Sequence, residues 1–86
     1  MIFEILFIEN SDRKSGFVLA RSMNDNIDFS LTDQSTLGGV PIKPFISQPR
    51  TTDKNGNPTF DVFAFHVKNK SDLALLQVGM LAELIP

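Results

Sequence analysis

The stretch Thr59-Phe60-Asp61-Val62-Phe63-Ala64-Phe65-His66-Val67 decides the fold class of this chain. It is rich in aromatic and β-branched residues, which favour strands over helices. On a period of two, Phe63, Phe65 and Val67 share one face, and His66 lies on the other. The pattern therefore predicts a strand that places Phe63 and Phe65 in the core.

Comparable strand patterns recur along the rest of the chain and are separated by turn-forming residues. They cover residues 2–8, 17–20, 27–31, 40–46 and 80–85. Residues 71–76 favour one short helical turn, with Ser71 as N-cap and Asp72 at the favourable end of the helix dipole. Asn55-Gly56, followed by Pro58, predicts a tight turn in a polar loop. We therefore predict an all-β fold, a small closed or partly open β-barrel of about six strands with one short helical turn, formed by residues 1–86 as a single domain.

The length, composition and net charge of the chain restrict the classes of function. The chain has 86 residues, a hydrophobic fraction of 42%, no cysteine and a net charge of −2. The absence of cysteine excludes disulfides and thiolate metal sites, and the net charge gives no global reason to expect nucleic-acid binding. The apolar run Ile2–Ile8 contains Glu4 and is too short to span a bilayer. We expect a cytoplasmic protein that does not bind membranes and carries no cofactor.

Catalytic chemistry finds little support in the residues. His66 is the only histidine, and zinc sites need three or four protein ligands. As a general base it would need a nearby nucleophile, and no nucleophile-elbow motif surrounds Ser15, Ser47 or Ser71. Asp53-Lys54-Asn55-Gly56 resembles the start of a calcium loop but lacks the later oxygen ligands, so an Asx-type turn is the better interpretation. We expect a packed or rim histidine and no enzyme.

The order of segments carries a family resemblance. The residues concerned are Phe3–Ile8, Ser15–Leu19, Phe63–Val67, Lys70–Leu73 and Val78–Leu81. The chain begins with a strand, a short polar loop with glycine and a second strand. Near its end it has a strand, a polar turn and a closing strand that follows a glycine. This order resembles the β-barrel second domain of translational GTPases such as elongation factor Tu.

The chain also departs from that family. Arg21-Ser22 stands where the family usually has a glycine, and Ile27-Asp28-Phe29 lacks its usual Gly-Asp turn. No G-x-x-x-x-G-K-[ST] phosphate loop is present, so the GTPase part is absent. The resemblance implies a binding module connected with RNA, the ribosome or translation.

Basic residues in predicted loops are the first candidate binding site. If the ends of the predicted strands bring them together, they would bind phosphates of single-stranded RNA; these residues are Arg50, Lys54, Lys68 and Lys70. The alternative is a solvated rim. All eight Phe residues fall in predicted strands, where core packing accounts for them.

The proline-containing run Val40–Ile46 is the second candidate. Pro41 and Pro44 cannot donate ladder hydrogen bonds, so the run predicts an edge or irregular strand. Exposed Ile42, Phe45 and Ile46 would form a protein interface or a homodimer contact. The alternative is that the prolines only protect a strand edge from aggregation.

Taken together, the sequence predicts a non-enzymatic binding module for RNA or a protein. The runner-up is an interaction subunit or homo-oligomeric accessory protein that uses the Val40–Ile46 edge. A third possibility, an enzyme related to flavin-binding split barrels, is disfavoured because those barrels are longer and bind their cofactor across a dimer.

Overall fold

A computed structural model describes residues 1–10, 16–24 and 28–86 of the chain. The predicted polar connection after Asn10 and the predicted strand residue Ile27 lie outside these residues. No helix in the described ranges is long and apolar enough to cross a membrane.

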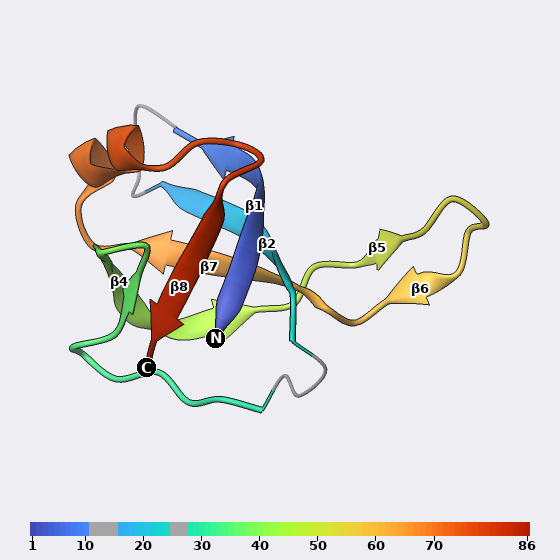
Figure 1. Ribbon diagram of the computed structural model, residues 1–86, viewed down its shortest axis with the longest axis horizontal. Coiled ribbons are helices and arrows are strands. Elements are labelled where there is room, and N and C mark those ends of the chain that lie inside the picture. Colours follow the sequence, from blue (N-terminus) through green and yellow to red (C-terminus); the bar gives the residue numbers. More distant parts are fainter. Residues whose placement is uncertain (11–15, 25–27) are drawn as a thin grey trace.

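Six antiparallel strands pair side by side until the last meets the first, so the sheet closes into an irregular ring (Figure 1). Their order around the ring is β1, β2, β7, β4, β3, β8, and their bounds are β1 Ile2–Glu9, β2 Phe17–Ser22, β3 Thr36–Leu37, β4 Val40–Ser47, β7 Val62–Val67 and β8 Leu81–Ile85. The pairing shifts register between Ile5 and Phe7 in β1 and between Ile42 and Ile46 in β4. The predicted all-β fold of about six strands is confirmed.

The inward side of the ring is a phenylalanine-centred core. Pairing sets Val18 opposite Phe65 and Ala20 opposite Phe63, and all four side chains are buried. Phe3 of β1 meets Phe65 edge-to-face, with ring centroids 5.1 Å apart, an arrangement that aromatic pairs favour. The predicted placement of Phe63 and Phe65 in the core is confirmed.

The predicted strand at residues 27–31 is wrong for the described residues 28–31, although Phe29 and Leu31 reach the core. Residues 28–31 form no strand, yet Phe29 and Leu31 pack against the core, and the Phe29 ring lies 5.4 Å from that of Phe63. Both edges of β2 are already occupied by β1 and β7, so this segment finds no free edge beside its predecessor. The ring instead takes the two residues Thr36 and Leu37 as β3.

A short 3-10 helix, η1 (Lys70–Leu75), lies at the end of the ring opposite the segment 28–31 (Figure 1). It contributes Leu73 to the core, followed by Leu76. The predicted N-cap at Ser71 is wrong, because the N-cap lies two residues earlier, at Asn69, which makes no side-chain hydrogen bond to the helix. Packing of Leu73, rather than a cap, holds this turn in place.

Gly16 allows η1 to approach the sheet closely. A Cβ atom at this position would lie 2.3 Å from Cδ1 of Leu73 and 2.6 Å from the carbonyl oxygen of Glu9. Any larger residue would push on the backbone of β1 as well as on a core leucine. Position 16 therefore has no room for a Cβ atom unless Leu73 or the backbone of β1 moves.

A two-stranded arm, the second feature of the fold, projects from the ring between β4 and β7 (Figure 1). It consists of β5 (Thr51–Thr52) and β6 (Pro58–Thr59). Oδ1 of Asp53 accepts hydrogen bonds from the backbone N–H groups of Asn55 and Asn57 at 2.8 and 3.0 Å, and Gly56 has φ of 82°. The predicted tight turn at Asn55-Gly56 and the Asx-type interpretation are both confirmed.

Candidate functional site

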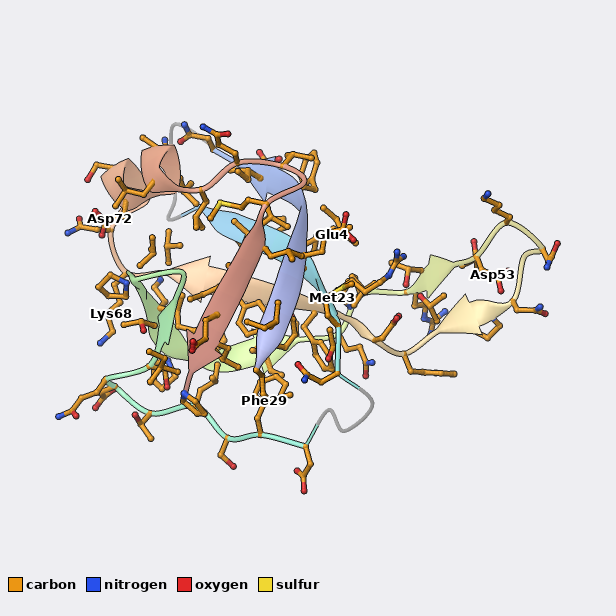
Figure 2. All side chains as sticks on the ribbon, in the orientation of Figure 1. Glu4, Met23, Phe29, Asp53, Lys68 and Asp72 are labelled. Carbon is orange, nitrogen blue, oxygen red and sulfur yellow. The ribbon has the colours of Figure 1, made fainter. Side chains whose placement is uncertain are left out.

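The four basic residues that the sequence groups as one binding site form two separate pairs. Arg50 and Lys54 belong to the arm, whereas Lys68 and Lys70 follow the far end of β7. Figure 2 shows this separation, with Asp53 at the tip of the arm and Lys68 on the opposite side of the molecule. Because β7 has six residues at about 3.3 Å each, it alone holds the pairs roughly 20 Å apart.

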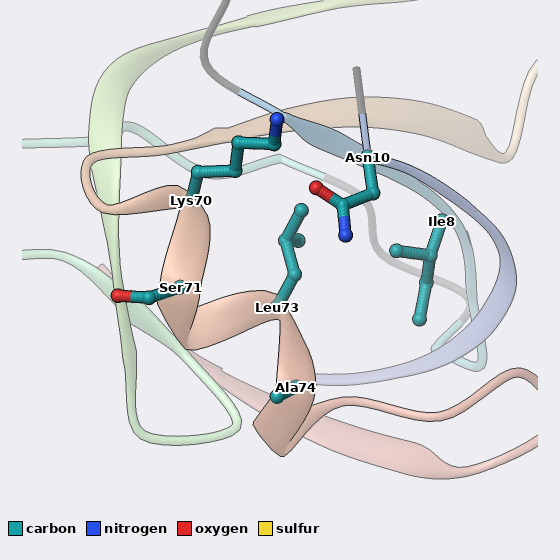
Figure 3. A pocket seen from close by; sticks show the side chains of 6 residues that line it. All are labelled: Ile8, Asn10, Lys70, Ser71, Leu73 and Ala74. Carbon is teal, nitrogen blue, oxygen red and sulfur yellow. The ribbon is translucent and has the colours of Figure 1, made fainter. Parts of the chain in front are cut away.

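The pair after β7 is already engaged within the protein. Nζ of Lys68 donates a hydrogen bond to the carbonyl oxygen of Asp33, and Lys70 also interacts with other parts of the chain. Lys70 borders a shallow hollow of about 570 Å³ between η1 and the end of β1. Figure 3 shows Leu73 pointing into this hollow, with Lys70 and Asn10 on either side and Ser71 pointing away. Lys70 is the one cation among the described residues that line this hollow, so these residues provide no cluster of cations for a phosphate.

The pair on the arm lines two different depressions. Arg50 borders a groove of about 370 Å³ at the arm base, together with Pro49 and Phe60. Lys54 borders another with Asp53, Asp61 and Arg21. The carboxylates beside Lys54 offset its charge, so the arm presents no continuous basic surface.

The candidate edge in β4 is irregular, as predicted, but its three residues differ in exposure. Ile42 has no exposed surface and belongs to the core. Ile46 is half-buried and packs against the core, whereas Phe45 is 52% exposed. Within β4, only Val40 and Pro41 pair with β3. Of the three predicted interface residues, Phe45 alone offers substantial exposed surface.

His66 lies beside Phe45 on the outer side of the ring. Its imidazole is 5.0 Å from the Phe45 ring and 5.7 Å from the Phe17 ring. Burial, and to a lesser degree the charge of Lys43, lower the pKa of His66 below its usual value. In the described ranges no three His, Asp or Glu side chains come together in a group that could hold a metal ion. His66 is thus a packed rim histidine that favours its neutral form.

An outward surface of β8, β1 and the end of β2 carries exposed apolar side chains that the sequence reading missed. Pairing places Ile2 opposite Glu83 and Glu4 opposite Leu81, with all four on the outer side of the sheet. The outward residues of the strands are Ile2, Glu4, Leu81, Glu83 and Ile85, and Met23 lies beside Ile2, whose carbonyl oxygen accepts the Met23 N–H at 2.9 Å. We call this set of six residues the β8–β1 face. β8 and β1 lie side by side in Figure 1, and Figure 2 labels Glu4 and Met23 beside β1.

The exposed fractions on the β8–β1 face are high for large apolar side chains. Ile2 is 37%, Met23 54%, Ile85 58% and Leu81 60% exposed. An antiparallel sheet with one solvated face normally carries polar residues there. Contiguous exposed apolar side chains bordered by polar ones mark interaction surfaces, so this face is the strongest candidate site on the described part of the molecule.

The two charged residues of the β8–β1 face itself are both acidic. Glu4 and Glu83 lie among the apolar side chains, and neither forms a salt bridge with any described residue. Arg21, opposite Glu4 on β2, pairs instead with Asp61, with Nε and Oδ2 3.6 Å apart. The face therefore combines apolar surface with two carboxylates that lack a cationic partner in the described ranges.

The sequence contained a signal for this face. Leu81-Ala82-Glu83-Leu84-Ile85 is apolar on both alternating sets apart from Glu83, and such a strand needs a cover on each side. The expectation that core packing accounts for every Phe is also wrong, since Phe7, Phe45 and Phe60 are 46%, 52% and 67% exposed. A strand pattern alone does not say whether its second face is covered.

Comparison with protein-family models, with curated proteins and with solved structures finds no significant match for this chain. The resemblance to the second domain of translational GTPases stays a prediction.

Proposed function

We propose that this chain is a non-enzymatic module that binds another protein through the β8–β1 face. The supporting observation is the outward exposure of Leu81, Ile85 and Ile2 on adjacent strands of one sheet surface. Burying apolar surface contributes about 25 cal/mol per Å². A protein partner would remove these side chains from water.

The proposal favours protein over RNA for an electrostatic reason. Phosphate binding needs several cations acting together, and the four predicted cations lie in two distant pairs. Glu4 and Glu83 on the β8–β1 face would repel a phosphate backbone. A connection with translation, which the family resemblance implies, is compatible with a protein partner as well.

The test is site-specific photocrosslinking in cells that naturally express the protein. A photoreactive residue replaces Leu81 in one variant and Asp53, at the tip of the arm, in the control. We expect a discrete protein adduct from position 81 and none from position 53, and we expect Leu81→Ser with Ile85→Ser to abolish co-purification of the same partner.

Two results would contradict the proposal. One is a nuclease-sensitive adduct, together with binding of labelled single-stranded RNA that falls steeply with salt and weakens in Lys68→Ala with Lys70→Ala. The other is an adduct that forms from the arm and not from position 81.

A further inference from the structure

The backbone of the β8–β1 face restricts the kind of protein segment that fits it. β8 is hydrogen-bonded to β1 on one side and to β3 on the other, and β1 is paired with both β8 and β2. An incoming segment therefore cannot join this part of the sheet as a further strand, which would require a free edge. It must pack side chains onto a surface whose backbone pairing is already formed.

The dimensions of the face match a short helix. Adjacent strands are about 4.8 Å apart, so β8 and β1 form a strip about as wide as an α-helix with its side chains. Leu81 and Ile85 are four residues apart on one strand, roughly 13 Å. A helix rises about 1.5 Å per residue, so one of about 10 to 14 residues would span both side chains and Ile2 between them.

The carboxylates select the charge of the helix. Glu83 lies opposite Ile2 and Glu4 lies opposite Leu81, so each carboxylate borders the apolar side chains. Neither pairs with a cation of the described residues. A partner with Lys or Arg at the border of its apolar stripe would neutralise both, whereas an acidic partner would bring like charges together.

The same charges disfavour the other occupants of an apolar face. In a two-fold symmetric dimer the same patch meets itself, which would bring Glu4 and Glu83 near their own copies. A membrane surface with anionic lipids attracts basic segments and would repel this face.

Given the proposed function, on which this inference rests, we propose that the partner segment is a basic amphipathic α-helix. Its apolar side packs on Ile2, Leu81 and Ile85, and its bordering Lys or Arg residues pair with Glu4 and Glu83. Charge complementarity then determines which helices bind, while the apolar side chains provide most of the contact.

The experiment uses two synthetic 14-residue helical peptides with the same leucine stripe, one bordered by lysines and the other by glutamates. Their binding to the full chain is measured by fluorescence anisotropy at low and high salt. We expect the lysine peptide to bind about tenfold tighter at low salt, and the difference to shrink at 1 M salt, where the screening length is about 3 Å.

Double variants of the protein test whether the preference for the lysine peptide comes from the β8–β1 face. Glu4→Gln with Glu83→Gln should weaken binding of the lysine peptide about three- to tenfold, as two surface ion pairs would. Asp33→Asn with Asp53→Asn changes the net charge equally away from the face and should leave binding within about twofold. Leu81→Ser with Ile85→Ser should abolish binding, and thermal melting of each variant confirms that it folds.

The outcomes separate this inference from the proposed function. Equal binding of both peptides that still depends on Leu81 and Ile85 would overturn the basic-helix inference and keep the protein-binding face. Equal weakening by the two charge-matched double variants would also overturn it, as would a dimer in sedimentation equilibrium that Ile85→Ser dissociates, or binding to anionic vesicles. Peptide binding unaffected by Leu81→Ser with Ile85→Ser would contradict both proposals.

Discussion

The ring and the β5–β6 arm are both made of antiparallel pairs, but different forces hold them. In the ring, each strand has neighbours on both sides and contributes side chains such as Phe3 and Phe65 to a common core. In the arm, no residue from Gln48 to Phe60 is buried. Its shape comes from the Asp53 turn, from the contact between the hydroxyls of Thr51 and Thr59, and from its two anchored ends.

This difference shows that turn chemistry is enough to shape a hairpin but not to stabilise a domain. An isolated two-stranded hairpin is marginal in water, and a core is what makes antiparallel pairing cooperative. If the ring and the arm depend on different forces, substitutions in the ring should cost much more stability than substitutions in the arm.

The largest contrast is expected between two phenylalanines three residues apart. Phe63→Ala removes a buried ring from the core and should lower the free energy of unfolding by about 3–5 kcal/mol. Phe60→Ala, at the base of the arm where the ring is 67% exposed, should change it by less than about 0.5 kcal/mol. Urea denaturation of both variants measures this, and similar losses would mean that the arm base belongs to the core.

A smaller loss is expected where η1 meets the ring. Gly16→Ala would place a methyl group against Leu73 and the Glu9 carbonyl, and overpacking of this kind costs about 1–3 kcal/mol. Gly16→Ala combined with Leu73→Ala relieves the side-chain contact but leaves the one with the backbone. The loss of stability in the double variant, measured by thermal melting, should therefore differ from the sum of the losses in the two single variants. Strict additivity would contradict a contact between position 16 and Leu73.

Shortening the arm should have little effect on the ring. Replacing residues 51–58 by a short Gly-containing turn removes only exposed or half-buried side chains, and the closure entropy of a loop changes slowly with its length. We expect the free energy of unfolding to change by less than about 1 kcal/mol, with cooperative melting retained. Loss of cooperative melting would show that the arm helps to hold β4 against β7.

The smallest effect concerns protonation on the outer side of the ring. Because burial lowers the pKa of His66 in the folded protein, the unfolded chain takes up the proton first as pH falls below the usual value of 6.5. The free energy of unfolding therefore includes a favourable part from neutral His66 above that pH. This part is lost as pH falls through the lowered pKa of the folded protein. His66→Gln should remove this part of the pH dependence, as seen in melting curves between pH 7.5 and 5. Parallel curves for the two proteins would contradict it.

Local pattern was sufficient for much of the fold. The period-two run around Phe63 and Phe65 predicted both the strand and its buried face, and Asn55-Gly56 predicted the turn of the arm, because each depends on residues close in sequence. For residues 28–31 the pattern predicted a strand where the chain forms none, although Phe29 and Leu31 pack against the core.

Only the tertiary structure decided how the ring closes and which side chains remain outside it. Thr36 and Leu37 are a strand because β4 and β8 lie on either side of them, and nothing in those two residues predicts it. The separation of Arg50 and Lys54 from Lys68 and Lys70 likewise follows from the length and direction of β7. The exposure of Leu81 and Ile85 depends on whether any other segment covers β8 and β1. Strand pairing and the covering of a face join residues that are distant in sequence, so a local pattern can specify which side chains share a face but not which face is buried.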